Sequence, residues 1–371
     1  MDPLKINAFA DDLLERCARR RLGLKATLEE FLPQAARKFG AQAAAVETLN
    51  EDLKKESFRW GAASPRLRWV FHPLDVAGRR VGSIAFGYRG PAPADPRYRE
   101  CLNALCEELD GVLWNIQTAA VKQRLMERVT RCLTRSVLRE AIDEAVGALH
   151  AEIPFRHLGL VYVNDDASGG NRIQYRIYAG RRCIHDSEQR PHHPLSRAIG
   201  KLGLNLLNPE QHVVRHTLGF REGMGFNLSG QAAGARNLGK LVAEVAGGLD
   251  TFGRDLMRIF ANSVSQRLID YNRERRHLAQ FFAPDVVSEL LSDPDYRRKH
   301  LSPRVKPVAI LYADINSFTK LCERALRRPD RIGEFVDHWS EGAVRIGWER
   351  GGVFDKMVGD CVIIHFGPPF Y

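Results

Sequence analysis

The chain has 371 residues, 44% hydrophobic and 27% charged, a composition typical of two or three globular domains rather than of a disordered or fibrous protein. Its formal net charge is +10, but the basic residues are scattered and match no DNA- or RNA-binding motif, so we expect no nucleic-acid partner. No apolar run approaches the roughly 18 residues that span a bilayer, and Met1–Lys5 lacks the order of a secretory signal, so we expect a cytoplasmic protein without a membrane span.

The first block begins with a predicted helix and continues with strands. Apolar residues recur at helical spacing across residues 22–39. Strand-like runs follow at Ala43–Leu49, Ser57–Gly61, Leu67–Val76 and Arg80–Tyr88, the last two flanking a glycine turn that predicts a hairpin. A segment rich in proline and glycine, residues 90–96, then ends the strand pattern, and we expect a helix after it.

The second block repeats this order. We expect a helix over Val129–His150, a short helix over Pro194–Leu202 and a closing helix that starts near Phe252. Between them we predict strands at Leu158–Asn164, Arg172–Ala179, Gly223–Ser229 and Asn237–Val245.

Two consecutive blocks of helix, strands and closing helix resemble paired GAF domains. GAF domains are α/β modules with an antiparallel sheet that bind small molecules or dimerise. The segments Gly219–Arg221, Phe226–Leu228 and Leu238–Leu241 look like the late strands of that family. The resemblance implies a GAF-like domain over residues 1–117 and a GAF domain with flanking helices over 118–272, with an unidentified small molecule as a possible ligand.

Apolar residues also follow alternating three- and four-residue steps on the two helices that leave these blocks. The first stripe comprises Leu102, Leu105, Leu109, Val112, Ile116, Ala119, Met126 and Leu133, and the second Met257, Ala261, Val264, Leu268, Tyr271 and Leu278. Heptad spacing of this kind lets two parallel helices pack together, so we predict a homodimer. The alternative is that each stripe packs on the sheet of its own domain.

The third block contains two carboxylates at strand ends. A predicted strand, Lys306–Ala313, runs into Asp314, and a helix is expected from about Lys320. The segment Gly351–Gly367 predicts a hairpin whose turn contains Asp360. If the two strands are neighbours in one sheet, Asp314 and Asp360 can share two divalent metal ions, which would activate an attacking oxygen and neutralise a leaving pyrophosphate.

The segments Val308–Thr319 and Gly351–Pro368 together look like the class III adenylyl/guanylyl cyclase domain, with the motifs about 45 residues apart. The resemblance implies an α/β (α+β) fold in which two GAF-like antiparallel-sheet domains, joined by long helices, precede the first half of a ferredoxin-like cyclase domain. It also implies an adenylate cyclase, a phosphorus–oxygen lyase of signal transduction that converts ATP to cyclic AMP and pyrophosphate.

The same resemblance assigns roles to single residues. It makes Asp314 and Asp360 the catalytic metal ligands, with the carbonyl of Ile315 as a further ligand, for two Mg²⁺ or Mn²⁺ ions. It makes Lys356 the contact to adenine, which favours ATP because guanylyl members typically carry an acidic residue there. The expected substrate-binding residues are therefore Lys356 and the residues that follow the first motif, Asn316, Ser317, Phe318 and Thr319.

The resemblance covers residues 305–371, the first half of the family's domain, after a helical linker over residues 273–304. The Asn and Arg that the family uses for ribose binding and transition-state stabilisation would follow Tyr371, so we expect this chain by itself to be inactive. The alternative function is that of a non-catalytic GAF sensor that dimerises and carries an incomplete cyclase segment.

Overall fold

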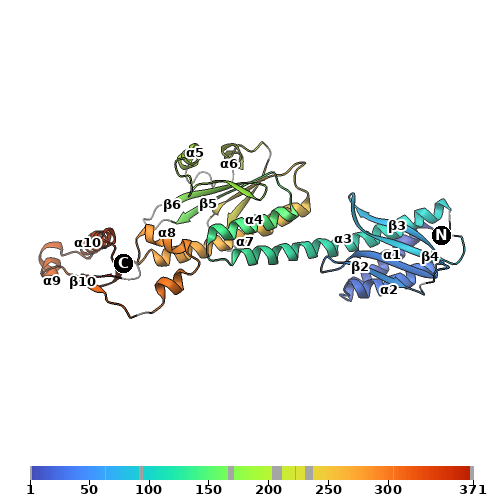
Figure 1. Cartoon of the computed structure of the whole chain (residues 1–371), viewed down its shortest axis with the longest axis horizontal. Helices are drawn as coiled ribbons and strands as arrows, with labels where there is room; N and C mark the ends of the chain where they lie inside the picture. Colours follow the sequence, from blue (N-terminus) through green and yellow to red (C-terminus); the bar gives the residue numbers. More distant parts are fainter. Residues whose placement is uncertain are drawn as a thin grey trace. The chain divides into compact units, whose positions relative to one another are not determined.

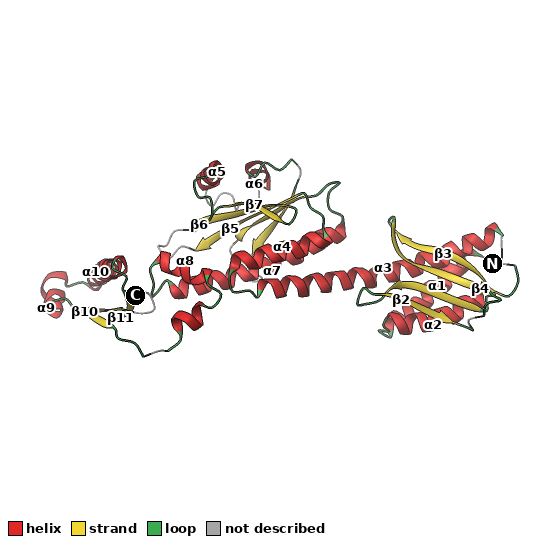
Figure 2. Cartoon of the chain, viewed as in Figure 1, coloured by secondary structure: helices red, strands yellow, loops and turns green. Residues whose placement is uncertain are grey.

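The computed structural model describes residues 2–62, 64–91, 93, 95–165, 171–202, 211–221, 223–229, 237–303 and 305–367. The chain is a mixed α/β protein (Figure 2) that separates into two compact units, Met1–Arg124 and Leu125–Tyr371. Over the described ranges, no helix combines the length and the apolar character that a bilayer crossing requires.

The first unit is a four-stranded antiparallel sheet with helices on one face (Figure 1). Its elements are α1 (Pro3–Arg19), α2 (Leu24–Lys38), β1 (Ala43–Leu49), β2 (Lys55–Trp60), β3 (Arg68–Val76), β4 (Arg79–Tyr88) and α3 (Pro96–Leu133). The strands lie in the order β2-β1-β4-β3. Alternate residues such as Val46, Ile84 and Phe86 are buried in one core with side chains of the three helices. The four predicted strands are confirmed, whereas the sequence analysis missed α1.

The predicted helix over Val129–His150 is wrong at its start. Helix α3 runs on to Leu133, and α4 (Leu138–Glu152) begins after a short break. At the break, the Thr134 hydroxyl donates to the carbonyl of Arg131 at 2.7 Å, a local bond that competes with helix propagation. The guanidinium of Arg267 donates to the carbonyls of Arg135 and Ser136, which satisfies backbone acceptors at this point.

The second unit begins with a five-stranded antiparallel sheet. Its elements are β5 (His157–Asp165), β6 (Asn171–Ala179), β7 (Arg182–Asp186), α5 (Pro194–Leu202), α6 (Gln211–Thr217), β8 (Met224–Ser229), β9 (Asn237–Glu244) and α7 (Thr251–Leu278). The strand order is β7-β6-β5-β9-β8. Helices α5 and α6 cover one face, where Ile199 and Val214 pack on Tyr175, and α4 and α7 cover the other (Figure 1). The predicted strands are confirmed, and β7 is an additional one.

The second apolar stripe is covered by its own chain, and the first is covered only in part. Leu102, Leu105 and Leu109 are buried in the core of the first unit, and Leu133 is buried in the second. All six residues of the second stripe, on α7, are buried as well. Packing on the chain's own sheets, the alternative stated above, accounts for these buried residues. Ala119 and Met126 of the first stripe are exposed on α3, and homodimerisation stays a prediction.

The third block forms a small sheet with one crossing helix. Its elements are α8 (Pro284–Ser292), a π-helical turn (Arg297–Leu301), β10 (Ala309–Ala313), α9 (Phe318–Leu321), a second π-helical turn (Cys322–Leu326), α10 (Pro329–Glu349), β11 (Val353–Val358) and β12 (Cys361–Phe366). Strand β12 lies between β10 and β11 and is antiparallel to both. Strands β10 and β11 are therefore parallel, joined by a crossover that contains α10, which is a split β-α-β arrangement.

Helix α10 and the segment that follows it approach the sheet closely because Gly347, on the helix, and Gly352, just after it, face Ile364 of β12. A Cβ atom at Gly347 would lie 2.5 Å from the Cδ1 atom of Ile364, and one at Gly352 would lie 2.6 Å from its Cγ2 atom. Both distances are shorter than ordinary contacts, so the absence of a side chain at these two positions sets the distance between helix and sheet.

Candidate active site

The two predicted carboxylates lie at the same end of the three-stranded sheet. Asp314 directly follows Ala313, which pairs with Val362 at the start of β12. Asp360 occupies the two-residue turn between β11 and β12, where Gly359 has a φ of +63°. The backbone N–H of Ile315 donates a 3.2 Å hydrogen bond to the Oδ2 atom of Asp360. This bond joins the segment after β10 directly to the β11–β12 turn.

The chain turns sharply after Asp314. Ser317 adopts a left-handed conformation with a φ of +59°, the N–H of Phe318 donates to the carbonyl of Ile315 at 3.2 Å, and Leu321 donates to the carbonyl of Ser317 at 3.0 Å. The following helix, α9, has 4 residues and passes into a π-helical turn. The predicted helix after the first carboxylate is confirmed, although it starts at Phe318 rather than Lys320 and continues as a π-helical turn.

The predicted substrate-binding residues lie on this turn. Asn316, Ser317 and Thr319 are exposed, and Phe318 is half-buried. Asp314 is exposed as well, whereas Asp360 is half-buried. The turn thus presents its polar side chains to solvent, next to the two carboxylates.

Trp339 is a contributor that the sequence analysis missed. Its indole N–H donates a 3.0 Å hydrogen bond to the backbone carbonyl of Asp360. Trp339 lies on α10 with Ile332, Phe335 and Val336, all of them half-buried and at helical spacing. That spacing could have indicated a tryptophan on the sheet-facing side of the helix, but its partner depends on the tertiary packing.

Lys356 lies on β11, four residues before Asp360, and its side chain is 63% exposed. The strand pairing shifts between Phe354 and Lys356, which is a β-bulge at Asp355. The ammonium group is 3.7 Å from the carboxylate of Asp355. The structure does not enclose Lys356 in a base-binding pocket, so its adenine contact stays a prediction.

The donor atoms at this end of the sheet suit a hard divalent cation. Two carboxylates and the backbone carbonyl of Ile315 are oxygen ligands of the kind that Mg²⁺ and Mn²⁺ prefer. The described ranges contain no group of three or more His, Cys, Asp or Glu side chains able to hold a metal ion. Side chains alone would therefore leave such an ion under-coordinated, and phosphate oxygens or water would have to complete its shell.

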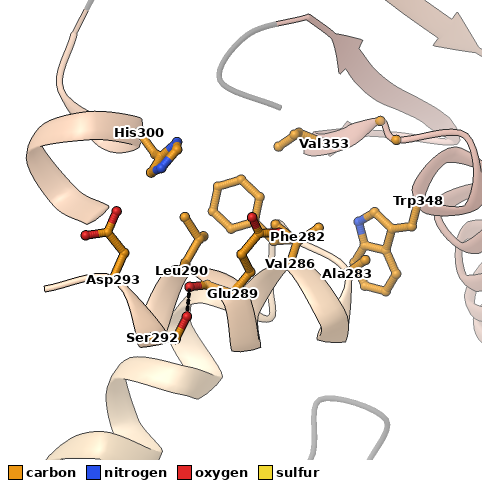
Figure 3. Close-up of a pocket in the computed structure, with 12 residues that line it drawn as sticks. Phe282, Ala283, Val286, Glu289, Leu290, Ser292, Asp293, His300, Trp348 and Val353 are labelled. Carbon is orange, nitrogen blue, oxygen red and sulfur yellow. Dashed lines mark hydrogen bonds between the residues drawn. The ribbon is translucent and has the colours of Figure 1, made fainter. Parts of the chain in front are cut away.

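A cavity of about 550 Å³, which we call the α8 cavity, lies at the opposite end of β11 from Asp360 (Figure 3). Phe282, Val286 and Leu290 form its apolar floor, facing Val353 at the start of β11. Next to it, the carbonyl of Phe281 accepts hydrogen bonds from the indole N–H of Trp348 and the amide N–H of Phe354, both at 3.1 Å. The α8 cavity lies between the linker, residues 273–304, and the three-stranded sheet. Its lining does not include Asp314 or Asp360.

Comparison with known proteins adds no relative. No protein-family model matches the chain, and no curated protein has a significantly similar sequence.

Proposed function

We propose that residues 305–371 are the metal-binding half of a class III nucleotidyl cyclase domain, and that the protein acts in the conversion of ATP to cyclic AMP. The observation that carries this proposal is the hydrogen bond from the Ile315 amide to the Asp360 carboxylate. It brings together two motifs that are far apart in the sequence, as a shared metal centre requires.

The fold of the third block supports the proposal. A split β-α-β unit with strand order β10-β12-β11 is the first half of a ferredoxin-like domain. In a full ferredoxin-like sheet, a further strand pairs with the outer edge of β10. In the described part of the chain no strand pairs with that edge, and Ile310, Leu311 and Tyr312 are 46–64% exposed.

The preceding sheets support a GAF-like regulatory part. Both are antiparallel, and the second has helices on its two faces. We infer that these two domains regulate the third block, with α7 and α8 as the connection.

The chemistry follows from the charge of the substrate. Bound Mg²⁺ or Mn²⁺ would lower the pKa of the ribose 3′-hydroxyl and neutralise the triphosphate. Asp314 and Asp360 would hold the ions. Trp339 and the Ile315 amide would fix the position and orientation of Asp360. An enzyme that positions charged groups in advance spends no free energy on reorganising them during the reaction.

Base selection would depend on Lys356. An ammonium group donates hydrogen bonds and accepts none, so it can bond the N1 acceptor of adenine but not the N1–H donor of guanine. Because Lys356 is exposed in the single chain, its burial would have to come from the rest of the site.

Metal binding by the chain itself provides the first test. We expect the electron paramagnetic resonance signal of free Mn²⁺ to fall on titration with the protein in the presence of ATP. Asp314→Asn and Asp360→Asn should each weaken this binding by about tenfold or more, the equivalent of losing one charged ligand. The matched control is Asp337→Asn, on the exposed side of α10. Equal binding by all four proteins would remove the metal assignment.

Activity is the second test and uses the protein as its gene encodes it. Cyclic AMP formation from ATP with Mn²⁺ should be lost in Asp314→Ala and in Asp360→Ala. Turnover within about tenfold of the wild type in either variant, a difference of about 1.4 kcal/mol in the barrier, would be incompatible with two-metal catalysis by this pair.

The second candidate function is a non-catalytic sensor. It is favoured by the exposure of Asp314 and Lys356 to solvent. Metal binding without cyclic AMP formation in the encoded protein would support the sensor and overturn the enzyme.

A further inference from the structure

The second sheet carries a large polar cavity on the face that α4 and α7 cover, away from the carboxylate pair. Its volume is about 830 Å³, and we call it the Asn164 cavity. The sheet contributes Tyr162, Asn164 and Arg176 to its wall, α7 contributes Tyr271, and α8 contributes Leu291. The other face of the same sheet is filled by an apolar core with α5 and α6, so the two faces of this domain have opposite characters.

The floor of the cavity is held rigidly by a buried guanidinium. Arg176 is 2% exposed, and its terminal nitrogens donate to the Arg139 carbonyl at 2.8 Å and to the Asp143 carboxylate at 3.0 Å. Its Nε atom is 3.3 Å from Asp186. Tyr178 donates to Asp143 at 2.9 Å. The carboxylates of Asp143 and Asp186 therefore compensate the positive charge of Arg176.

Three buried polar atoms of residues in the lining have no hydrogen-bond partner among the described residues: the acceptors Asn164 Oδ1 and Asp186 Oδ2, and the donor Nε of Arg176. Asn164 is 5% exposed, and its Oδ1 atom has no hydrogen-bond partner among the residues that the structure describes. A buried acceptor without a donor destabilises the free protein, because it has lost its hydrogen bonds to water. The cavity therefore offers a ligand a built hydrogen-bonding position.

Among the charged residues that line the cavity, carboxylates outnumber guanidinium groups by one. Three guanidinium groups, of Arg139, Arg176 and Arg275, meet four carboxylates, of Glu140, Asp143, Asp186 and Glu188. Burial and the neighbouring carboxylate of Asp186 raise the pKa of Glu188, in spite of the three arginines. A cation bound next to Glu188 would stabilise the charged form of this carboxylate.

We propose that the Asn164 cavity binds a small primary amine with a hydrophobic body. The ammonium group supplies three donors and no acceptor, which matches the Asn164 carbonyl and the Glu188 carboxylate. The apolar part would lie against Tyr162, Tyr271 and Leu291, where aromatic rings also stabilise a neighbouring positive charge. The site is separate from the proposed cyclase centre, so the proposal does not depend on that function.

The test uses three probes of equal shape and different charge: benzylamine, benzyl alcohol and benzoate. Isothermal titration calorimetry of the full chain should show benzylamine binding about tenfold more tightly than benzyl alcohol, as one charge-assisted hydrogen bond would give. Benzoate should not bind measurably. Equal affinities for the three probes, a preference for benzoate, or no binding of benzylamine would each overturn the proposal.

Two variants locate the site. Glu188→Gln keeps the size of a side chain that is partly open to solvent and removes its charge, and it should lower the affinity for benzylamine about fivefold to tenfold. Asn164→Leu removes the acceptor and should have a similar effect, with circular dichroism confirming the fold. Glu100→Gln, an exposed position on α3 in the other unit, is the matched control and should leave the affinity unchanged. Unchanged binding in Glu188→Gln would exclude this cavity as the site.

Discussion

Replacing Gly347 by alanine tests the packing that holds the candidate site in place. In a helix interior, exchange of glycine for alanine normally stabilises a protein by about 0.8–1 kcal/mol. At Gly347, however, the new Cβ atom would lie 2.5 Å from the Cδ1 atom of Ile364. Overpacking of this kind costs about 1–3 kcal/mol, so the two effects together predict a net loss of about 1 kcal/mol.

Gly342 provides the control on the same helix. A Cβ atom there would have no neighbour within 4 Å, so Gly342→Ala should stabilise the protein by about 0.5–1 kcal/mol. The two substitutions change the same chemical group on α10. Their free energies of unfolding should therefore differ by about 2 kcal/mol, and that difference measures the contact with the sheet alone.

A double-mutant cycle identifies the atom responsible. Ile364→Val removes Cδ1 and should cost about 0.5–1.5 kcal/mol by itself. In combination with Gly347→Ala it should cost at least about 1 kcal/mol less than the sum of the single variants, because the clash disappears. Urea unfolding followed by tryptophan fluorescence gives all the values, since Trp339 and Trp348 both lie on α10. Additive effects, or a stabilising Gly347→Ala, would refute the reasoning.

The remaining predictions concern one residue of the candidate site and two buried or half-buried charges. Lys356→Glu in the encoded protein should raise the activation barrier with ATP by about 1–3 kcal/mol, which lowers the catalytic efficiency, and should raise the efficiency with GTP only slightly. An unchanged ratio of the two efficiencies would mean that Lys356 is a solvated surface residue. Arg176→Met should destabilise the second unit by about 3–5 kcal/mol, measured by chemical denaturation, because it leaves buried carboxylates without their counter-charge; a loss below about 1 kcal/mol would show that these groups are hydrated. Although burial opposes it, hydrogen bonds from Tyr296 and Arg297 hold the pKa of Glu274 below its ordinary value. The stability that Glu274 contributes should therefore be present above about pH 4.3 and lost as the pH falls through the lowered pKa, and Glu274→Gln should remove this part of the acid dependence of the melting temperature.

The sequence predicted the regular elements well where local pattern and tertiary role agree. The short helix α5 was predicted with the bounds that the structure gives, Pro194–Leu202, because proline begins it and its apolar residues keep one face. The β10–β12 region was also expected, since alternation and a glycine turn specify a hairpin locally. The break between α3 and α4 was missed because it depends on Arg267, more than 130 residues further on.

The candidate site could be predicted only in part, because the sequence specifies its residue types but not their tertiary contacts. Residue type and spacing identify Asp314 and Asp360, but their placement at one sheet end follows from the strand order, which no local pattern specifies. The roles of Trp339 and of the Ile315 amide arise from contacts between distant segments. The exposure of Lys356 reflects a β-bulge, a feature without a distinctive signature in this sequence.

Helix α8 is the common wall of the two cavities in the second unit. Val286, Glu289 and Leu290 face the α8 cavity, Ser288 and Leu291 face the Asn164 cavity, and Ser292 borders both. A nine-residue helix cannot rotate or shift for one neighbour without changing the volume available to the other. If a ligand in one cavity shifted α8, the occupancies of the two cavities would be linked, with equal strength in both directions. A ligand in the Asn164 cavity that moved α8 would then also displace the wall that faces the start of β11. A ligand in the α8 cavity would change the affinity of the Asn164 cavity by the same factor.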